Sequence, residues 1–139
     1  SPYYRDITSN LIKGASDLLE SNSVDYNILN VPGALEIAPA IKLVLDKSLK
    51  NPFFDGFVAL GCVIKGETPH FDFICSSVFN SILSISTNYS KPIGNGIITA
   101  LNINQAKNRS AKNNKNKPNK GSEAANAVVM ILKNEPKKI

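Results

Sequence analysis

The stretch from Gly61 to Asp72, GCVIKGETPHFD, holds the residues best suited to chemistry. His70 is the only histidine in the chain, and an imidazole titrates in the range that proton transfer near neutral pH requires. Gly66 lets a ligand approach the backbone, and Thr68 is predicted as the N-cap of a helix with Pro69 in its first turn. Free amides at such a helix start can bind phosphate. The pattern therefore predicts an anion site beside a proton-transfer group, with a capping or packing histidine as the alternative.

Four other side chains have both a chemical and a structural interpretation. The guanidinium of Arg109 suits a phosphate ester, or it is a surface charge at a helix C-terminus. Glu36 could hydrogen-bond substrate hydroxyls, or it is an ordinary acidic residue near a helix start. Asp72 could orient the imidazole of His70, or it complements a helix dipole. Tyr3 taken alone is a packing aromatic. The residues themselves do not decide between these alternatives.

Strands and helices alternate along the chain, which predicts an α/β domain with a parallel sheet covered by helices. The most continuous apolar run, 56–64, predicts a strand buried on both faces. Further strands are expected at 93–101 and, from strict alternation, at 24–31. Helices are predicted where apolar residues share one face, at about 7–19, 34–49, 71–88, 103–109 and 122–132. Pro39 implies that the second helix begins nearby or is kinked.

Ligands of open α/β sheets bind at the carboxyl ends of the strands. We expect three polar segments at that edge, namely 32–36, 65–70 and 94–96. The first recognisable element is a helix, whereas sheets of this class normally begin with a strand. We therefore expect the first strand of the fold to lie ahead of Ser1.

Composition narrows the class of protein. The 139 residues suit one domain over 1–139, and 42% hydrophobic with 19% charged residues is ordinary for a globular chain. Neither a membrane span nor a signal-peptide pattern is present in the sequence. Cys62 and Cys75 stand in apolar surroundings without metal-ligand spacing, which predicts buried reduced thiols and a cytoplasmic location.

The net charge of +5 raises the question of a nucleic-acid partner. The positive residues concentrate at 107–120 and at the C-terminus, and no aromatic residues interleave with them. A Lys/Asn run of this kind predicts a solvated loop rather than a nucleic-acid surface, although it can help to attract an anionic substrate.

Four ordered segments resemble one known family. They are VPGALEIAPAIK at 31–42, GCVIKGETPHFD at 61–72, PIGNGIIT at 92–99 and NKGSEAA at 119–125. From about Tyr3 to Leu132 the chain resembles the 6,7-dimethyl-8-ribityllumazine synthases. The resemblance implies a flavodoxin-like three-layer αβα sandwich with a central parallel sheet. It also implies a transferase of riboflavin biosynthesis that needs no metal or organic cofactor.

The resemblance implies a condensation of 5-amino-6-(D-ribitylamino)uracil with 3,4-dihydroxy-2-butanone 4-phosphate, with His70 as the catalytic proton-transfer residue. Its implied substrate-binding residues are Tyr3 for pyrimidine stacking, Ala34, Leu35 and Glu36 for the ribityl chain, Cys62, Val63 and Ile64 for the uracil edge, Asn95 for the pocket wall, and Glu67, Thr68, Arg109 and Lys120 for the phosphate.

Three positions depart from the commonest family pattern. Asn95 stands where many members have a phenylalanine, Lys65 replaces an arginine, and the loop at 110–119 is a few residues longer. Family members build the pocket between subunits of a pentamer, so we expect a homo-oligomer in which the partner contributes the side with Asn95 and Arg109. Riboflavin synthase is a further possible partner. A non-catalytic flavin- or lumazine-binding protein on the same scaffold is the alternative function.

Overall fold

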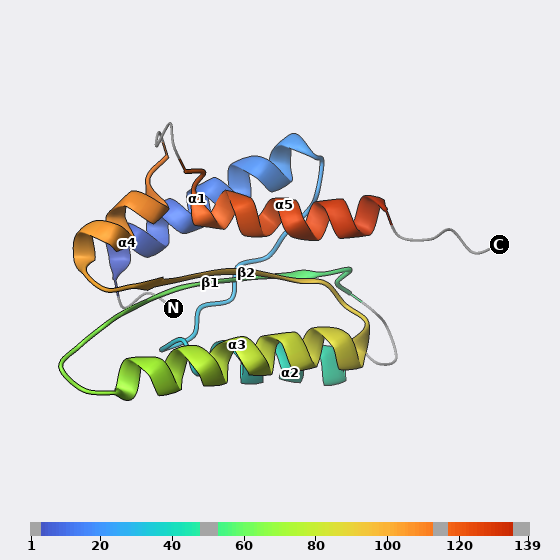
Figure 1. The fold of residues 1–139 in the computed structure, drawn as a ribbon. Helices are drawn as coiled ribbons and strands as arrows, with labels where there is room; N and C mark the ends of the chain where they lie inside the picture. Colours follow the sequence, from blue (N-terminus) through green and yellow to red (C-terminus); the bar gives the residue numbers. More distant parts are fainter. Residues whose placement is uncertain (1–3, 48–52, 113–116, 135–139) are drawn as a thin grey trace.

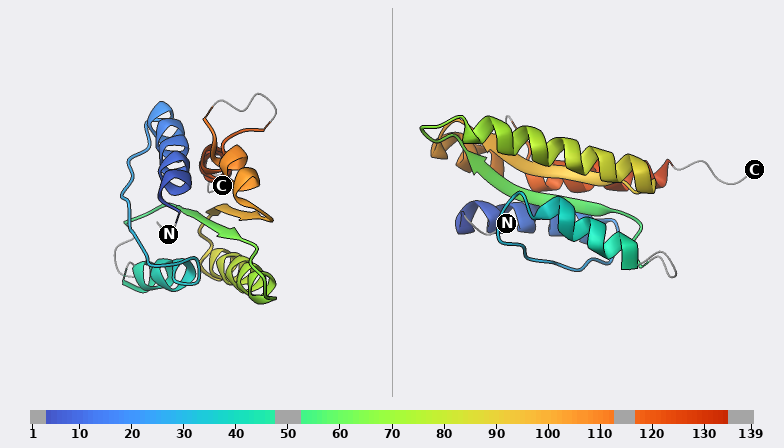
Figure 2. Two further views of the ribbon diagram at one scale, coloured as in Figure 1. Left: turned by 90° about the vertical axis from the view of Figure 1, so that its left-hand side faces the viewer. Right: turned by 90° about the horizontal axis from the view of Figure 1, so that it is seen from below.

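The computed structural model describes residues 4–47, 53–112 and 117–134, which form helix layers on both sides of a sheet (Figure 1). The elements follow one another as α1 (Arg5–Ser21), α2 (Ile37–Lys47), β1 (Phe57–Ile64), α3 (His70–Tyr89), β2 (Ile93–Ala100), α4 (Ile103–Ser110) and α5 (Lys120–Lys133). Helices α1, α4 and α5 cover one face, and α2 and α3 cover the other, as the two rotated views also show (Figures 1 and 2). The predicted αβα layering is thus confirmed.

The sheet consists of β1 and β2, which pair in parallel from Phe57 opposite Ile93 to Ile64 opposite Ala100. Both strands are apolar runs, and the long helix α3 provides the crossover that parallel pairing requires. The amide of Lys65 donates to the carbonyl of Ala100 at 2.8 Å, so the carboxyl ends of the two strands lie side by side at one edge of the sheet. That edge is where the fold class places a ligand.

The strand predicted at 24–31 is not formed. In the described part of the chain the sheet has only the two strands above, and 24–31 is a connection between α1 and α2 without regular structure. Its apolar side chains are mostly exposed, with Ile28 at 56% and Leu29 at 66%, whereas Val31 at its end packs against the core. An alternating pattern gives a strand only when a neighbouring strand accepts its hydrogen bonds, and none of the described strands pairs with this segment.

Apolar side chains from both helix layers pack on the sheet. On the α2–α3 face the core consists of Ile37, Ala38, Ile41, Leu45, Ala59, Val78, Ile82 and Ile97. On the other face it consists of Ile7, Leu11, Ala15, Leu19, Cys62, Ile98, Ala100, Ala106, Ala125 and Val129. Since β1 contributes to both cores, the prediction of a strand buried on two faces is confirmed.

Helix α5 lies directly against α1 because small residues allow the backbones to approach. A Cβ atom at Gly121 would collide with the backbone carbonyl of Leu11, so only glycine fits at that crossing. The start of α5 therefore lies directly beside the middle of α1, at Leu11. This contact positions the basic residues of the candidate site.

Candidate active site

The turn after β1 leads into α3 and carries His70 as the first helical residue. Residues 65–70 are all exposed. The predicted cap at Thr68 is wrong, because Pro69 occupies the N-cap position with φ −62° and ψ −3° and no side-chain cap is formed. The carbonyl of Pro69 accepts the amides of Asp72 at 3.0 Å and Phe73 at 3.5 Å, so the hydrogen bonds of the helix begin at Pro69 rather than at Thr68.

The imidazole of His70 is therefore presented to solvent at the helix start rather than packed in a core. Among the described residues no hydrogen bond joins it to Asp72, so an orienting role for Asp72 is not seen. An exposed imidazole at a helix start is free to exchange protons with a bound ligand. The packing alternative for His70 is wrong, and its role in catalysis stays a prediction.

The segment Ala34–Glu36 precedes α2 on the same face of the sheet as α3. Its backbone forms a turn directly before the helix, with the amide of Ile37 donating to the carbonyl of Ala34 at 3.2 Å. Leu35 and Glu36 are exposed, whereas Ala34 packs against the core. Pro39 falls in the first turn of α2, so of the two predicted alternatives the helix begins near Pro39. Helices α2 and α3 run in the same direction along one face of the sheet (Figure 2), so this segment and the His70 turn both lie at helix starts on that face.

The last three residues of β1 alternate between the two faces. Cys62 and Ile64 pack in the core under α1 and α4, and Val63 packs against the α2–α3 core. Burial raises the pKa of the Cys62 thiol to about 11, so it is protonated at neutral pH and unsuited to act as a nucleophile. Cys75 is only half-buried on α3, which corrects the prediction that both thiols are buried.

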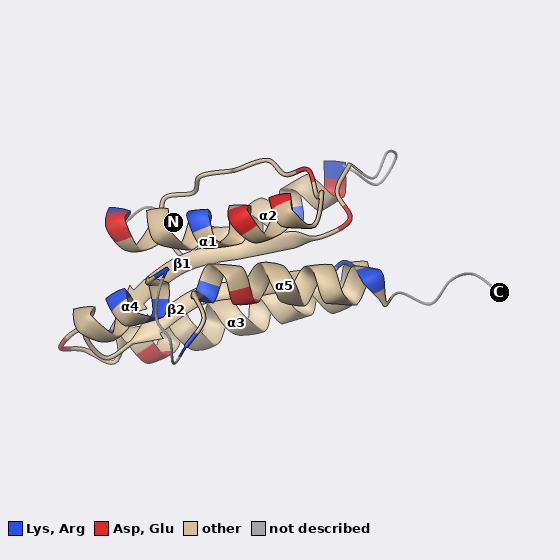
Figure 3. Ribbon diagram, turned by 90° about the horizontal axis from the view of Figure 1, so that it is seen from above, with Lys and Arg blue, Asp and Glu red and all other residues tan. Residues whose placement is uncertain are grey.

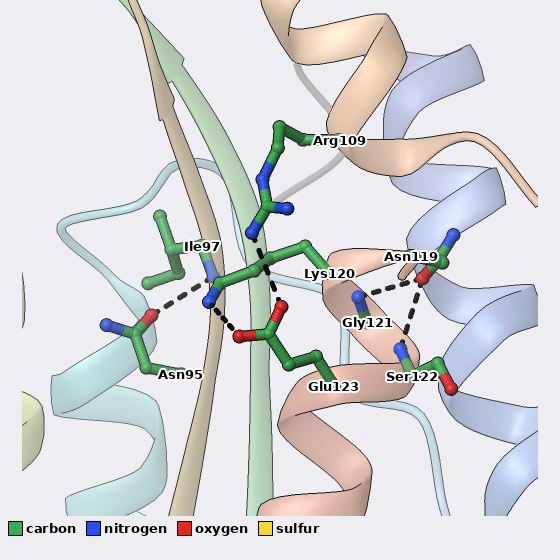
Figure 4. Close-up of polar contacts among 8 residues, drawn as sticks. All are labelled: Asn95, Ile97, Arg109, Asn119, Lys120, Gly121, Ser122 and Glu123. Atoms are coloured by element: carbon green, nitrogen blue, oxygen red, sulfur yellow. Dashed lines mark hydrogen bonds and ion pairs between the residues drawn. The ribbon is translucent and has the colours of Figure 1, made fainter. Parts of the chain in front are cut away.

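On the opposite face, two cations from different helices meet at one carboxylate (Figure 4). Arg109 Nη2 lies 3.3 Å from Glu123 Oε2, and Lys120 Nζ lies 3.1 Å from Glu123 Oε1. Hydrogen bonding from Lys120, with the charges of Lys120 and Arg109, holds the pKa of Glu123 below its ordinary value. The sequence prediction missed Glu123, although its spacing of three residues from Lys120 on a helix is a recognised ion-pair spacing.

Asn119 holds this cluster together. As the N-cap of α5 its Oδ1 accepts the amides of Gly121 at 2.8 Å and Ser122 at 3.1 Å. Its Nδ2 donates to the carbonyl of Asn10 in α1 at 3.0 Å and to that of Ser110 at the end of α4 at 2.6 Å. One buried amide thus joins three helices and fixes Lys120 beside the end of α4. The sequence prediction also missed Asn119, although an asparagine directly before a helix is a typical N-cap.

Basic residues gather where α4 meets α5, with the acidic Glu123 in the first turn of α5 (Figure 3). The loop at 110–119 connects these helices; residues 113–116 of it lie outside the described chain, as does Tyr3. The half-buried Arg109 and Lys120 are paired with a carboxylate rather than spread over a solvated surface.

Asn95 lies in the first half of β2, opposite Ala59, and not at the carboxyl end of the strand. The expectation that 94–96 reaches that edge is therefore wrong, because the strand continues to Ala100. Asn95 Oδ1 accepts the amide of Ile97 at 3.0 Å. The side chain thus satisfies an amide that β1 does not, on the outermost strand of the described sheet.

The predicted residues fall into two groups at one end of the molecule. The His70 turn and Ala34–Glu36 lie with α2 and α3, whereas Arg109 and Lys120 lie with α4 and α5 on the other face (Figures 1 and 2). The sheet runs between the groups. Within one chain Arg109 and Lys120 meet at Glu123, whereas the two groups lie on opposite faces of the sheet.

The described residues contain no cluster of three or more His, Cys, Asp or Glu side chains able to hold a metal ion. Over the same ranges, no helix has the length and apolarity needed to cross a membrane.

Parallel strands between helix layers, with polar helix starts and a two-cation cluster, define an open α/β protein, a class in which ligands bind at the carboxyl ends of the strands. The family model for 6,7-dimethyl-8-ribityllumazine synthase matches residues 1–135. The 6,7-dimethyl-8-ribityllumazine synthase of Bartonella bacilliformis is 39% identical over 131 residues, covering 94% of this chain and 85% of the relative.

Two other relatives carry the same name. The protein of Afipia carboxidovorans is 41% identical over 132 residues, covering 94% of this chain and 79% of the relative. The protein of Agrobacterium fabrum is 39% identical over 132 residues, covering 94% and 89%. The chain belongs to the 6,7-dimethyl-8-ribityllumazine synthase family, transferases of riboflavin biosynthesis, and its layered α/β structure agrees with the flavodoxin-like fold of that family.

Proposed function

We propose that the chain condenses 5-amino-6-(D-ribitylamino)uracil with 3,4-dihydroxy-2-butanone 4-phosphate to give 6,7-dimethyl-8-ribityllumazine, phosphate and water. The 5-amino group attacks the ketone, and imine formation, loss of phosphate, ring closure and loss of water follow. Besides family membership, the observation that supports this reaction is the cluster in which Arg109 and Lys120 meet at Glu123. Two converging cations suit the phosphate group of the second substrate.

His70 is the proton-transfer residue of the proposal. Its exposed imidazole at the start of α3 can take a proton from the attacking amine and return one to the departing oxygen. Glu67 and Thr68 precede it in the same exposed turn and are proposed to line the phosphate together with Arg109 and Lys120. Most of the rate enhancement would come from holding the two substrates together, since no cofactor is part of the proposed reaction.

The pyrimidine substrate is proposed to bind along the end of β1 and the start of α2. Cys62, Val63 and Ile64 offer backbone groups at the strand end, and the exposed Leu35 and Glu36, with Ala34, face the ribityl chain. Tyr3 would stack on the ring. Asn95 would line the pocket through Nδ2, since its Oδ1 already accepts an amide.

A site shared between subunits follows from the two groups on opposite faces of the sheet. We propose a homopentamer in which Asn95, Arg109 and Lys120 of one subunit complete the His70 side of the next. Exposed apolar side chains on α3, among them Phe73 at 72% and Leu83 at 64%, offer a surface for such contacts. Riboflavin synthase as a partner and a cytoplasmic location, implied by the family resemblance, are parts of the same proposal.

Incubation with both substrates tests the reaction, with lumazine absorbance and phosphate release as the readouts. We expect the two signals to appear together in equal amounts. A folded oligomer that binds the lumazine but forms no product would contradict the proposal and favour the non-catalytic binding protein. Sedimentation velocity measures the oligomer in the same sample.

Subunit mixing tests the shared site. With the phosphorylated substrate well below the KM of the Arg109→Ala variant, His70→Ala and Arg109→Ala chains are each expected to have little activity. Co-refolded in equal amounts they restore about a quarter of the wild-type sites, because one interface in four then combines the two intact sides. A site built within one chain would gain nothing from mixing. Each variant refolded with itself is the control.

A further inference from the structure

Glu123 differs from an ordinary surface carboxylate because its two oxygens bind different cations from different helices. Oε2 meets Arg109 of α4 at 3.3 Å and Oε1 meets Lys120 at the start of α5 at 3.1 Å (Figure 4). The cations are 29% and 26% exposed, whereas the carboxylate is 44% exposed. The acid therefore lies on the open side of the pair.

The carboxylate has a clear electrostatic effect on its neighbours. Two cations held this close repel one another, and an anion between them offsets that repulsion. Helix α5 fixes the position of Glu123, whose amide donates to the carbonyl of Asn119 at 3.0 Å. Glu123 thus keeps Arg109 and Lys120 converged while no substrate is bound.

A phosphate group has the same charge sign and the same bridging geometry as this carboxylate. We propose that Glu123 is a positioning residue that occupies the phosphate place between Arg109 and Lys120, and that the phosphorylated substrate displaces it. The inference rests on the proposed phosphate role of the two cations. Glu123 then lowers the affinity for phosphate and helps the released phosphate to leave.

Substitution of the charge distinguishes this role from a structural one. Glu123→Gln keeps the shape and a hydrogen-bond acceptor but removes the anion that remains near the bound phosphate. We expect inorganic phosphate to bind about three- to tenfold more tightly to this variant, as the repulsion between two anions a few ångströms apart in partly exposed surroundings suggests. A side chain that only supported the fold would weaken binding when changed.

Two further variants serve as controls. Glu123→Asp keeps the charge, and we expect its phosphate affinity to stay within about twofold of wild type. Asp46→Asn on α2 removes a carboxylate of 41% exposure that is paired with Lys42, and it lies on the other face of the sheet. It should leave phosphate affinity unchanged, which excludes a general effect of net charge.

The experiment is titration of the oligomeric protein with inorganic phosphate, followed by ³¹P NMR or calorimetry, on wild type and the three variants. A gain confined to Glu123→Gln supports the inference. Unchanged or weaker binding by Glu123→Gln, or an equal gain by Glu123→Asp or Asp46→Asn, overturns it. Turnover of both substrates by the wild-type sample is measured in parallel. An inactive wild type refutes the proposed function. If the wild type is active and Glu123→Gln does not bind phosphate more tightly, only the role of Glu123 is refuted.

Discussion

Replacement of Asn119 by alanine is the most direct test of how this chain builds its cation cluster. The variant loses the two hydrogen bonds that cap α5 and the two that reach Asn10 and Ser110. Losing an N-cap costs about 1 kcal/mol of unfolding free energy. Ser110 is fully buried, so its orphaned carbonyl adds about 1–3 kcal/mol. The expected total is about 2–4 kcal/mol.

Asn102→Ala is the matched control for this variant. Asn102 caps α4 through one hydrogen bond, from the amide of Gln105 at 2.9 Å, and its side chain has no comparable links to other helices. Its loss should cost about 1 kcal/mol or less. Residue type and cap position are the same in both variants, so the difference in cost isolates the contacts that join α5 to α1 and α4.

The unfolding free energies of the two variants are compared by thermal and denaturant unfolding, followed by circular dichroism. Equal protein concentrations are needed because the chain is expected to oligomerise. A midpoint lowered by roughly 6–12 °C corresponds to the expected cost for a chain of this size. Phosphate affinity should fall as well, because Lys120 is no longer held beside Arg109. Equal losses in Asn119→Ala and Asn102→Ala would refute the reasoning.

Four other predictions concern single residues. Gly121→Ala presses a methyl group against the backbone of α1 and should cost about 1–3 kcal/mol, whereas Gly66→Ala meets nothing within 4 Å and should cost less; equal denaturation midpoints would contradict this packing. Because burial raises the pKa of Cys62 to about 11, alkylation of its thiol should be slow at pH 7, and its rate should rise about tenfold per pH unit below that pKa. Fast alkylation at pH 7 would show that the thiol is not buried. Arg109→Ala should raise KM for the phosphorylated substrate about tenfold or more and change KM for the pyrimidine far less, and equal changes would exclude a phosphate role. His70→Ala should lower kcat about a hundredfold and leave residual activity, and an unchanged rate would remove His70 from the mechanism.

The elements with local signals were predictable from the sequence. The run at 56–64 was expected as a strand, and β1 spans Phe57–Ile64, because an unbroken apolar stretch has few other ways to be buried. The start of α3 was predicted within one residue from the polar turn before it. Only the cap was wrong, since the hydrogen bonds of the helix begin at the carbonyl of Pro69 and no side chain caps them.

The strand expected at 24–31 failed for a physical reason. Its alternation is real, but the hydrogen bonds of a strand come from a neighbour that may lie anywhere in the chain. Ile28 and Leu29 are exposed, so an alternating sequence pattern does not by itself place apolar side chains in the core.

Long-range contacts also explain which site residues were missed. Asn119 is recognisable as a cap, but its bond to Asn10 spans 109 residues, and no local pattern reports it. Glu123 has the spacing of an ion pair with Lys120, but its second partner comes from another helix. Residue types therefore suggested a phosphate site. Which side chains meet at the proposed site depends on how α1, α4 and α5 pack together.

The position of the sheet decides how the two halves can act together. His70 is the first residue of α3 and Arg109 lies in α4, so the two residues belong to helix layers on opposite faces of the sheet. Proton transfer requires heavy atoms within about 3 Å, which is why we propose that His70 acts together with Arg109 of a neighbouring subunit rather than of its own chain. Within each chain the hydrogen bonds of Asn119 hold Lys120 beside the end of α4, and Pro69 stands at the start of α3 directly before His70. In the proposed oligomer the first group of one subunit would meet the second group of the next, and holding both substrates between them is how positioning alone would accelerate the condensation.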